Sequence, residues 1–146
     1  MLTQPLSFLF DRDLQRLRTE IEAFISEADL WRVSGAVTNS AGNLCLHLCG
    51  NLEHFIGGVL GGSGYVRDRE NEFAARNIPR AELLAEVDRT RDVLAKAFAA
   101  MSDEDLGKTF PLKVFGEDMT IAYFMLHLEG HLNYHLGQVN YLRRML

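Results

Sequence analysis

Histidine is concentrated in two short segments of this chain. Of its five histidines, two lie in HLCGNLEH and three in HLEGHLNYH, and most of the sequence separates the two segments. Successive residues of an α-helix are rotated by about 100°, so His131 and His135 differ by about 40° and one turn. Both imidazoles then point to one side of the helix, and neutral imidazole binds zinc, nickel, copper and iron. The pair is therefore a candidate metal chelate.

The other histidine segment can supply a further ligand from a second helix. On a helical wheel, Asn43, His47 and His54 fall within about 40° of one another. Metal sites in helical bundles are built from side chains on facing helices. The spacing does not choose between His47 and His54, which share a face and lie about 10 Å apart along the axis. One of the two is expected to meet the pair on the last helix.

A site made of three imidazoles would leave a divalent ion with an open position. That position can hold water, lower its pKa to about 7, or polarise a bound oxygen or sulfur. We expect Gln138, about 20° from His131, to hydrogen-bond a ligand, and His127 to lie at the rim. A His-x-x-x-His pair taken alone also fits two partly buried histidines that bind no metal. The second histidine-bearing helix favours the metal site.

Apolar residues at three- and four-residue spacing predict four helices that would position these side chains. Asp11 or Ser7 is the expected cap of the first helix, and the second is apolar on almost every side, so it should be central. The expected fold is an all-α antiparallel four-helix bundle, formed by residues 1–146 as a single domain. The predicted helices cover about residues 11–31, 38–60, 79–101 and 118–146.

Two connections between these helices are unusual. The glycine-rich stretch GGSGYVRDRENEFAARNIP is expected to be a long irregular loop between the second and third helices. In GKTFPLKVFGEDMT, before the last helix, alternating β-branched and aromatic residues predict one or two short extended pieces around Lys113–Phe115.

Composition and charge exclude several classes of protein. The net charge is −5 with scattered basic residues, which argues against a nucleic-acid partner. The start, MLTQPLSFLFDRDLQR, lacks the features of a signal peptide, and the longest apolar segment has about ten residues, too few to span a membrane. Cys45 and Cys49 are four residues apart, beyond disulfide reach on a helix, and are expected to be reduced core residues. We expect a cytoplasmic protein.

Three segments resemble the DinB/YfiT-like proteins, in particular an uncharacterised DinB-like branch with an LHLxGNL segment. They are LCLHLCGNLEHFIGG, VRDRENEF and HLEGHLNYHLGQVNYLRRML, in this order over nearly the whole chain. The resemblance implies a four-helix bundle, a homodimer, and a divalent ion, often nickel or zinc, held by His47, His131 and His135. It selects His47 because this residue occupies the histidine of the motif, whereas the branch has no ligand at His54.

The resemblance also implies a class of reaction. Characterised members of the wider superfamily are metal-dependent transferases or isomerases that use low-molecular-weight thiols such as bacillithiol or mycothiol. We therefore expect a metal-dependent thiol S-transferase or hydrolase that acts on a small molecule. Arg67 and Arg69 are either ligands for a carboxylate of the thiol or solvated loop residues beside Asp68 and Glu70. The alternatives are a non-catalytic metal-binding or stress-response protein, and an interaction module whose histidines are polar core residues.

Overall fold

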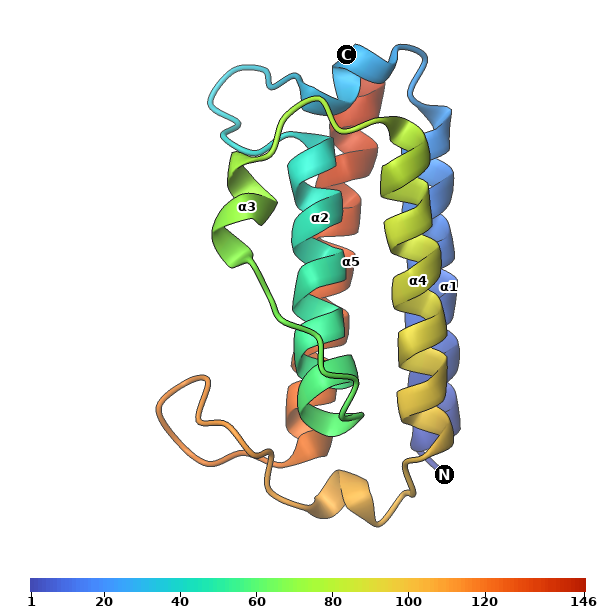
Figure 1. The fold of residues 1–146 in the computed structure, drawn as a ribbon, viewed down its shortest axis with the longest axis vertical. Helices are drawn as coiled ribbons and strands as arrows, with labels where there is room; N and C mark the ends of the chain where they lie inside the picture. The colour runs from blue at the N-terminus through green and yellow to red at the C-terminus, as the bar shows by residue number, and fades with distance from the viewer.

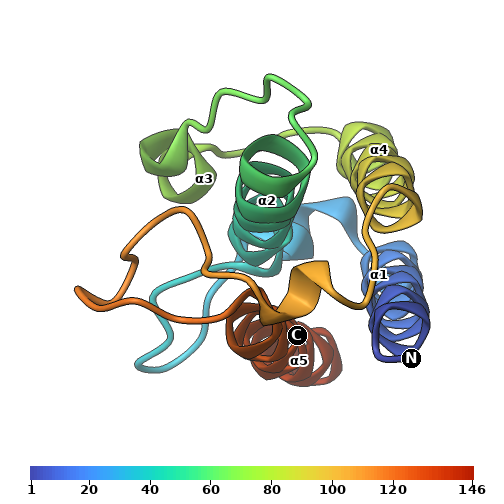
Figure 2. The same ribbon diagram turned by 90° about the horizontal axis from the view of Figure 1, so that it is seen from below.

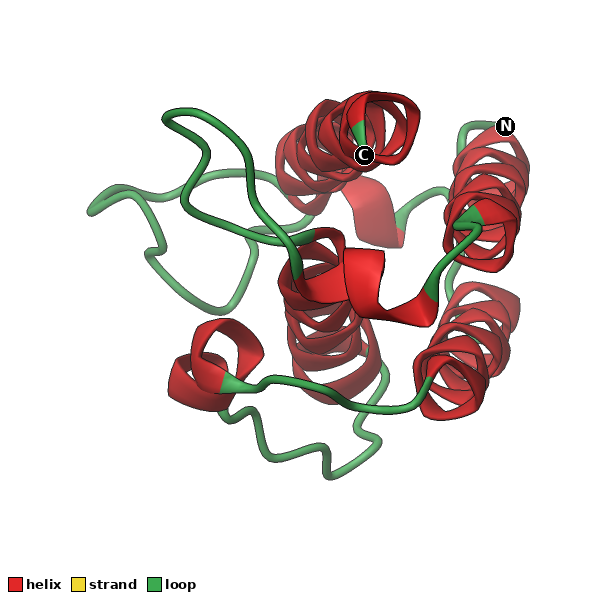
Figure 3. Cartoon of the chain, turned by 90° about the horizontal axis from the view of Figure 1, so that it is seen from above, coloured by secondary structure: helices red, strands yellow, loops and turns green.

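Every regular element of the computed structural model, which describes residues 1–146, is helical. The helices are α1 (Thr3–Ala23), α2 (Ala41–Leu52), α3 (Arg69–Ala74), α4 (Arg80–Ala99) and α5 (Ile121–Met145). Figure 1 shows α1, α2, α4 and α5 side by side along the long axis, with the short α3 outside α2. The views along that axis show α2 near α5 and α1 next to α4 (Figures 2 and 3). The all-α prediction is confirmed.

The apolar stripes predicted from the sequence form one buried cluster. In α1, the residues Leu6, Phe10, Leu14, Leu17 and Ile21 recur every three or four positions, and each is at most 1% exposed. The long helices α2, α4 and α5 bury equivalent stripes against them. Burial of these side chains drives the helices together, because each contributes roughly 1.5–3 kcal/mol relative to exposure. None of the helices combines the length and the apolar composition that spanning a membrane requires.

Helix α2 lies in the centre of the fold, as predicted. The Ser40 hydroxyl caps it by accepting a hydrogen bond from the Asn43 backbone N–H at 3.2 Å. Every residue of α2 except Leu46 is buried. The helix continues as a π-helix, Glu53–Leu60, and ends at Gly61. Widened turns of this kind occur frequently at functional sites.

The first helix begins earlier than predicted. It starts at Thr3 without a side-chain cap, so neither Asp11 nor Ser7 caps it. Pro5 is tolerated because the N–H groups of the first helical turn have no intrahelical acceptor. The helix also ends at Ala23, and the predicted last part is instead a separate 3-10 turn, Glu27–Trp31.

Both connections differ from their predicted form. The stretch expected to be an irregular loop contains α3, whose start is capped by Asp68 through its hydrogen bond from the Asn71 N–H at 3.0 Å. No strand forms at Lys113–Phe115; an isolated bridge between Thr109 and Thr120 closes the base of that loop instead. A single bridge leaves the rest of the segment without a partner strand.

A pair of carboxyl groups lies between α1 and α5. Asp13 is fully buried and accepts hydrogen bonds from Arg12, Arg16 and Asn133. Glu129 accepts one from Asn133, while its other oxygen is buried without a donor. Burial, together with the hydrogen bond that the protonated group makes to Asp13, raises the pKa of Glu129 to about 7. At pH values between 4.5 and about 7, Glu129 therefore carries a proton in the folded protein but not in the unfolded chain.

This pair makes stability depend on pH. Between the ordinary pKa of 4.5 and about 7, folded Glu129 is protonated and the unfolded residue is not, so the free energy of unfolding falls as pH rises through this window. Glu129→Gln should remove that loss. The difference in stability between variant and wild type should therefore be about 1–2 kcal/mol more favourable to the variant at pH 8 than at pH 5, after allowance for partial exposure. Urea unfolding of both proteins at the two pH values measures the difference, in which the other titrating groups cancel. Parallel pH profiles would contradict the prediction.

Candidate metal centre

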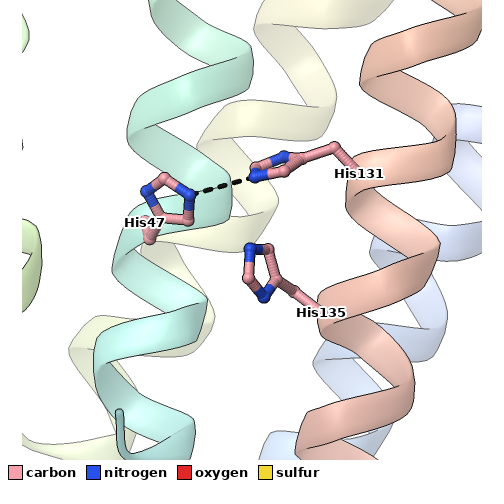
Figure 4. Close-up of side chains that lie close together, drawn as sticks. All are labelled: His47, His131 and His135. Atoms are coloured by element: carbon pink, nitrogen blue, oxygen red, sulfur yellow. Dashed lines mark hydrogen bonds between the residues drawn. The ribbon is translucent and has the colours of Figure 1, made fainter. Parts of the chain in front are cut away.

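Helices α2 and α5 bring three histidines together. The candidate ligand atoms of His47, His131 and His135 all lie within 4.8 Å of one another, and Figure 4 shows His47 on α2 facing the other two on α5. The Nε2 atoms of His47 and His131 are 3.1 Å apart. Two nitrogens bound to one tetrahedral zinc, each at about 2.0–2.1 Å, would be about 3.3 Å apart. The spacing therefore fits a shared ion.

A carboxylate fixes the orientation of His47. Its Nδ1 is 2.9 Å from Glu72 Oε1, and Arg67 holds both oxygens of Glu72 through hydrogen bonds of 2.8 Å. Arg67 Nη2 also lies 3.4 Å from Nδ1, but both groups are donors if Nδ1 carries the proton. The shorter carboxylate contact places the proton on Nδ1, so His47 Nε2 carries a lone pair, which accepts from His131 Nε2 in this structure and would be available to an ion.

Gly50 makes room for this carboxylate. A Cβ atom at Gly50 would lie 2.2 Å from Glu72 Oε2, so no other residue fits there without displacing Glu72. Asn43 holds the same segment, because its amide donates to the carbonyls of Glu72 and Ala75 at 3.0 and 2.9 Å. Asn43 thus acts on the position of α3 and not directly on the three imidazoles. Burial would raise the pKa of Glu72, but hydrogen bonds from Arg67 and His47 hold it below its ordinary value.

The two histidines of α5 differ in their hydrogen bonds. His135 Nδ1 lies 2.6 Å from Gln138 Oε1, which can only accept, so the proton is on Nδ1 and Nε2 is free. His131 Nδ1 is buried without a partner, and His131 Nε2 faces His47. Burial, and then the charges of His135 and His47, lower the pKa of His131 to about 4. Burial also lowers the pKa of His135, against the effect of Gln138. Both imidazoles are therefore neutral at pH 7, the form that binds a metal.

The remaining predicted residues lie around this cluster. His127 is exposed, with its ring centroid 6.4 Å from that of His131, and it also contacts Phe115 at 4.8 Å. His54 does not join the cluster and packs against Phe55 instead. Arg67 is engaged by Glu72, and its side chain is only 12% exposed, which makes it unsuited to binding a free carboxylate.

Two positions at the site were missed from the sequence. Glu72 lies in the stretch expected to be irregular. A helical wheel shows Gly50 only as a small residue at the edge of the histidine face and gives no sign of the carboxylate that fills the space beside it. The only sequence signal for Glu72 was the segment RDRENEF, which contains several carboxylates. The segment has no helical periodicity that would indicate which carboxylate faces the histidines. Phe73, next to Glu72, covers His47 with a ring-centroid distance of 4.8 Å.

Fold and site define an all-helical protein with three histidines that could hold a metal ion. The chain belongs to the family described as "Protein of unknown function (DUF1572)", which matches residues 9–146. A comparison with curated proteins gave no match. The family description names no activity.

Proposed function

We propose that this protein is a divalent-metal-dependent enzyme of the DinB/YfiT-like type, an antiparallel four-helix bundle whose ion is held by His47, His131 and His135. The observation that carries the proposal is that two of the three imidazoles are already oriented for an ion, through Glu72 and Gln138. The group contains no fourth protein ligand, as is typical of catalytic rather than structural sites.

The chemistry we propose is thiol S-transfer or hydrolysis of a small molecule in the cytoplasm. When bound, a divalent ion such as nickel or zinc supplies Lewis acidity at its open position. The chain keeps the ligands ready: Glu72 holds the proton of His47 at Nδ1, and Gln138 does the same for His135. Such partners typically strengthen metal binding 10- to 100-fold. Because Arg67 is engaged by Glu72, it positions His47 rather than binding the thiol.

Metal content per chain is the first test of this proposal. Tag-free protein should contain about one nickel or zinc ion per chain, measured by inductively coupled plasma mass spectrometry. The loaded protein should then transfer a low-molecular-weight thiol to an electrophile, or hydrolyse an ester, and lose that activity with a chelator while keeping its helical circular dichroism. Unfolding on chelation would instead identify a structural ion, and no uptake at all would contradict the proposal.

We also propose that the chain forms a homodimer through the outer face of α5. This face carries large side chains that are each more than half exposed: Tyr123, Leu126, Tyr134, Tyr141 and Met145. Two glycines on the same face, Gly130 and Gly137, have open space where a Cβ would lie, so packing within the chain does not require them. Glycine inside a helix costs about 1 kcal/mol relative to alanine, which a closely packed second helix would offset.

Charge selects an antiparallel pairing of the two α5 helices. Glu117 and Asp118 precede α5, and Arg144 lies at its exposed end. With Tyr134 at the two-fold axis, Arg144 of one copy approaches the acidic start of the other helix, whereas a parallel pairing would place like charges together.

Tyr134→Cys should therefore form a covalent dimer of twice 16.5 kDa with a short thiol cross-linker. Phe8→Cys, equally exposed on α1, is the matched control, and equal cross-linking of both variants would contradict the proposal.

A further inference from the structure

A cavity of about 320 Å³ lies between the segment that precedes α2 and the last turns of α5. Gln138 lines it, and the same side chain accepts the hydrogen bond of His135. The cavity is thus one residue away from a candidate metal ligand. Its volume is at the lower end of the range for small-molecule pockets, about 300–1,000 Å³.

The wall of the cavity is apolar and uncharged. Six of its nine lining residues are hydrophobic, among them Val37, Leu44, Leu142 and Met145, and none of the nine is acidic or basic. An ionised ligand would lose its hydration here without gaining a counter-charge, which costs several kcal/mol. Val37 is 40% exposed, so the fold leaves part of this apolar surface open. The wall therefore selects an uncharged ligand with a mostly apolar body.

Polar groups at the cavity can orient such a ligand. The oxygen of the Gln138 amide is engaged by His135, while its nitrogen makes no hydrogen bond within the chain and can only donate. Thr38 and Asn39 line the same cavity with uncharged side chains. A ligand carbonyl that accepts from Gln138 would polarise the amide and strengthen its bond to His135, because hydrogen bonds in a chain reinforce one another.

We infer that this cavity binds the non-reacting part of the substrate: an uncharged, mostly apolar group of about ten non-hydrogen atoms with a carbonyl or similar acceptor placed on Gln138. This inference rests on the proposed function, because it assigns the cavity to the substrate of the same metal centre. Binding energy from the apolar group would hold the reactive end near the open position of the ion.

Hexanamide, which combines a short apolar chain with a neutral amide, is the probe for this site, and hexanoate is its charged counterpart. In ¹⁵N and methyl NMR spectra of the full chain, hexanamide should shift the Gln138 side-chain amide and the Met145 methyl signals. Hexanoate should bind at least about tenfold more weakly, a difference of about 1.4 kcal/mol. Equal binding of the two probes, or shifts at other residues, would overturn the inference.

A matched pair of variants tests the location. Val37→Trp should fill the cavity and weaken hexanamide binding by at least about tenfold. Val33→Trp, in the same segment and similarly exposed but outside the cavity lining, should leave binding within about twofold. Equal effects of the two variants would overturn the assignment, as would hexanamide binding that weakens with rising protein concentration, because a second copy would then occupy the cavity.

The same titration separates this inference from the proposed function. Hexanamide binding to metal-free protein reports on the cavity alone, whereas the visible absorption of cobalt-loaded protein reports on the ion. A change in the cobalt spectrum on hexanamide addition supports the link through Gln138. Hexanamide binding by protein that takes up no metal would overturn the metal enzyme and leave a ligand cavity. Metal uptake without hexanamide binding would overturn the cavity and leave the enzyme.

Discussion

Replacing both His131 and His135 with alanine should abolish stoichiometric metal uptake. The double variant leaves His47 as the only imidazole of the cluster, and a single neutral ligand does not hold a divalent ion against water. Metal content by mass spectrometry, after incubation with nickel or zinc and gel filtration, should fall from about one ion per chain to background. The fold should persist, because both side chains are only half-buried and the core stripe of α5 is unchanged.

Single variants of His47 and His54 then separate the two histidines that spacing alone could not. His47→Ala should lower metal uptake as strongly as loss of either histidine on α5, since its Nε2 lies 3.1 Å from that of His131. His54→Ala should leave uptake unchanged, because His54 packs on Phe55 and not on the cluster. The reverse outcome, with His54 essential and His47 dispensable, would mean that the ion lies elsewhere.

Helical periodicity predicted most of the long helices because their burial is one-sided. The stripe that begins at Leu6 in α1 and the one that ends at Leu142 in α5 both face the shared core. The short helix α3 was not predicted, because its six residues make less than two helical turns, too few to show a periodic pattern of apolar residues. Its position depends on a tertiary contact, the hydrogen bonds from Asn43 to the backbone of Glu72 and Ala75, which local sequence does not encode.

The same limit applies to the candidate site. The wheel correctly placed His131 and His135 on one face, because both belong to a single regular helix. Whether His47 or His54 meets them depends on how α2 and the π-helix that continues it lie along α5, and one helix alone carries no information about that register. The chain also changes to a π-helix at Glu53, so a wheel drawn at 100° per residue no longer describes His54. The partner of His47, Glu72, comes from a third element.

Gly50→Ala should weaken metal binding about 10- to 100-fold, although position 50 makes no contact with an ion. A methyl group there would lie 2.2 Å from Glu72 Oε2, so the carboxylate must move away and release His47 Nδ1. His47 could then rotate or carry its proton on Nε2, which removes a ligand lone pair. The affinity is measured by competition with a metal-binding dye at pH 7.

Helix propensity lets this variant separate a loss of metal affinity from a loss of stability. Alanine in place of glycine inside a helix is favoured by about 1 kcal/mol where space allows, so intrinsic propensity would stabilise α2 in this variant. A loss of metal affinity that is larger than any loss of stability therefore reports on the displaced carboxylate and not on general damage. Gly58→Ala is the matched control, because a Cβ there meets its nearest atom at an ordinary 3.6 Å. Equal affinity losses at both positions would contradict the mechanism.

A double-mutant cycle identifies Glu72 as the group through which Gly50 acts. Glu72→Ala should itself weaken metal binding about 10- to 100-fold, because it removes the acceptor that holds the proton of His47 on Nδ1. With Glu72 absent, the added methyl group at position 50 has nothing to displace. Gly50→Ala should then cost little further affinity in the Glu72→Ala background, giving strongly non-additive effects. Additive losses would show that Gly50 influences the site by another route, such as a shift of α2 against α5.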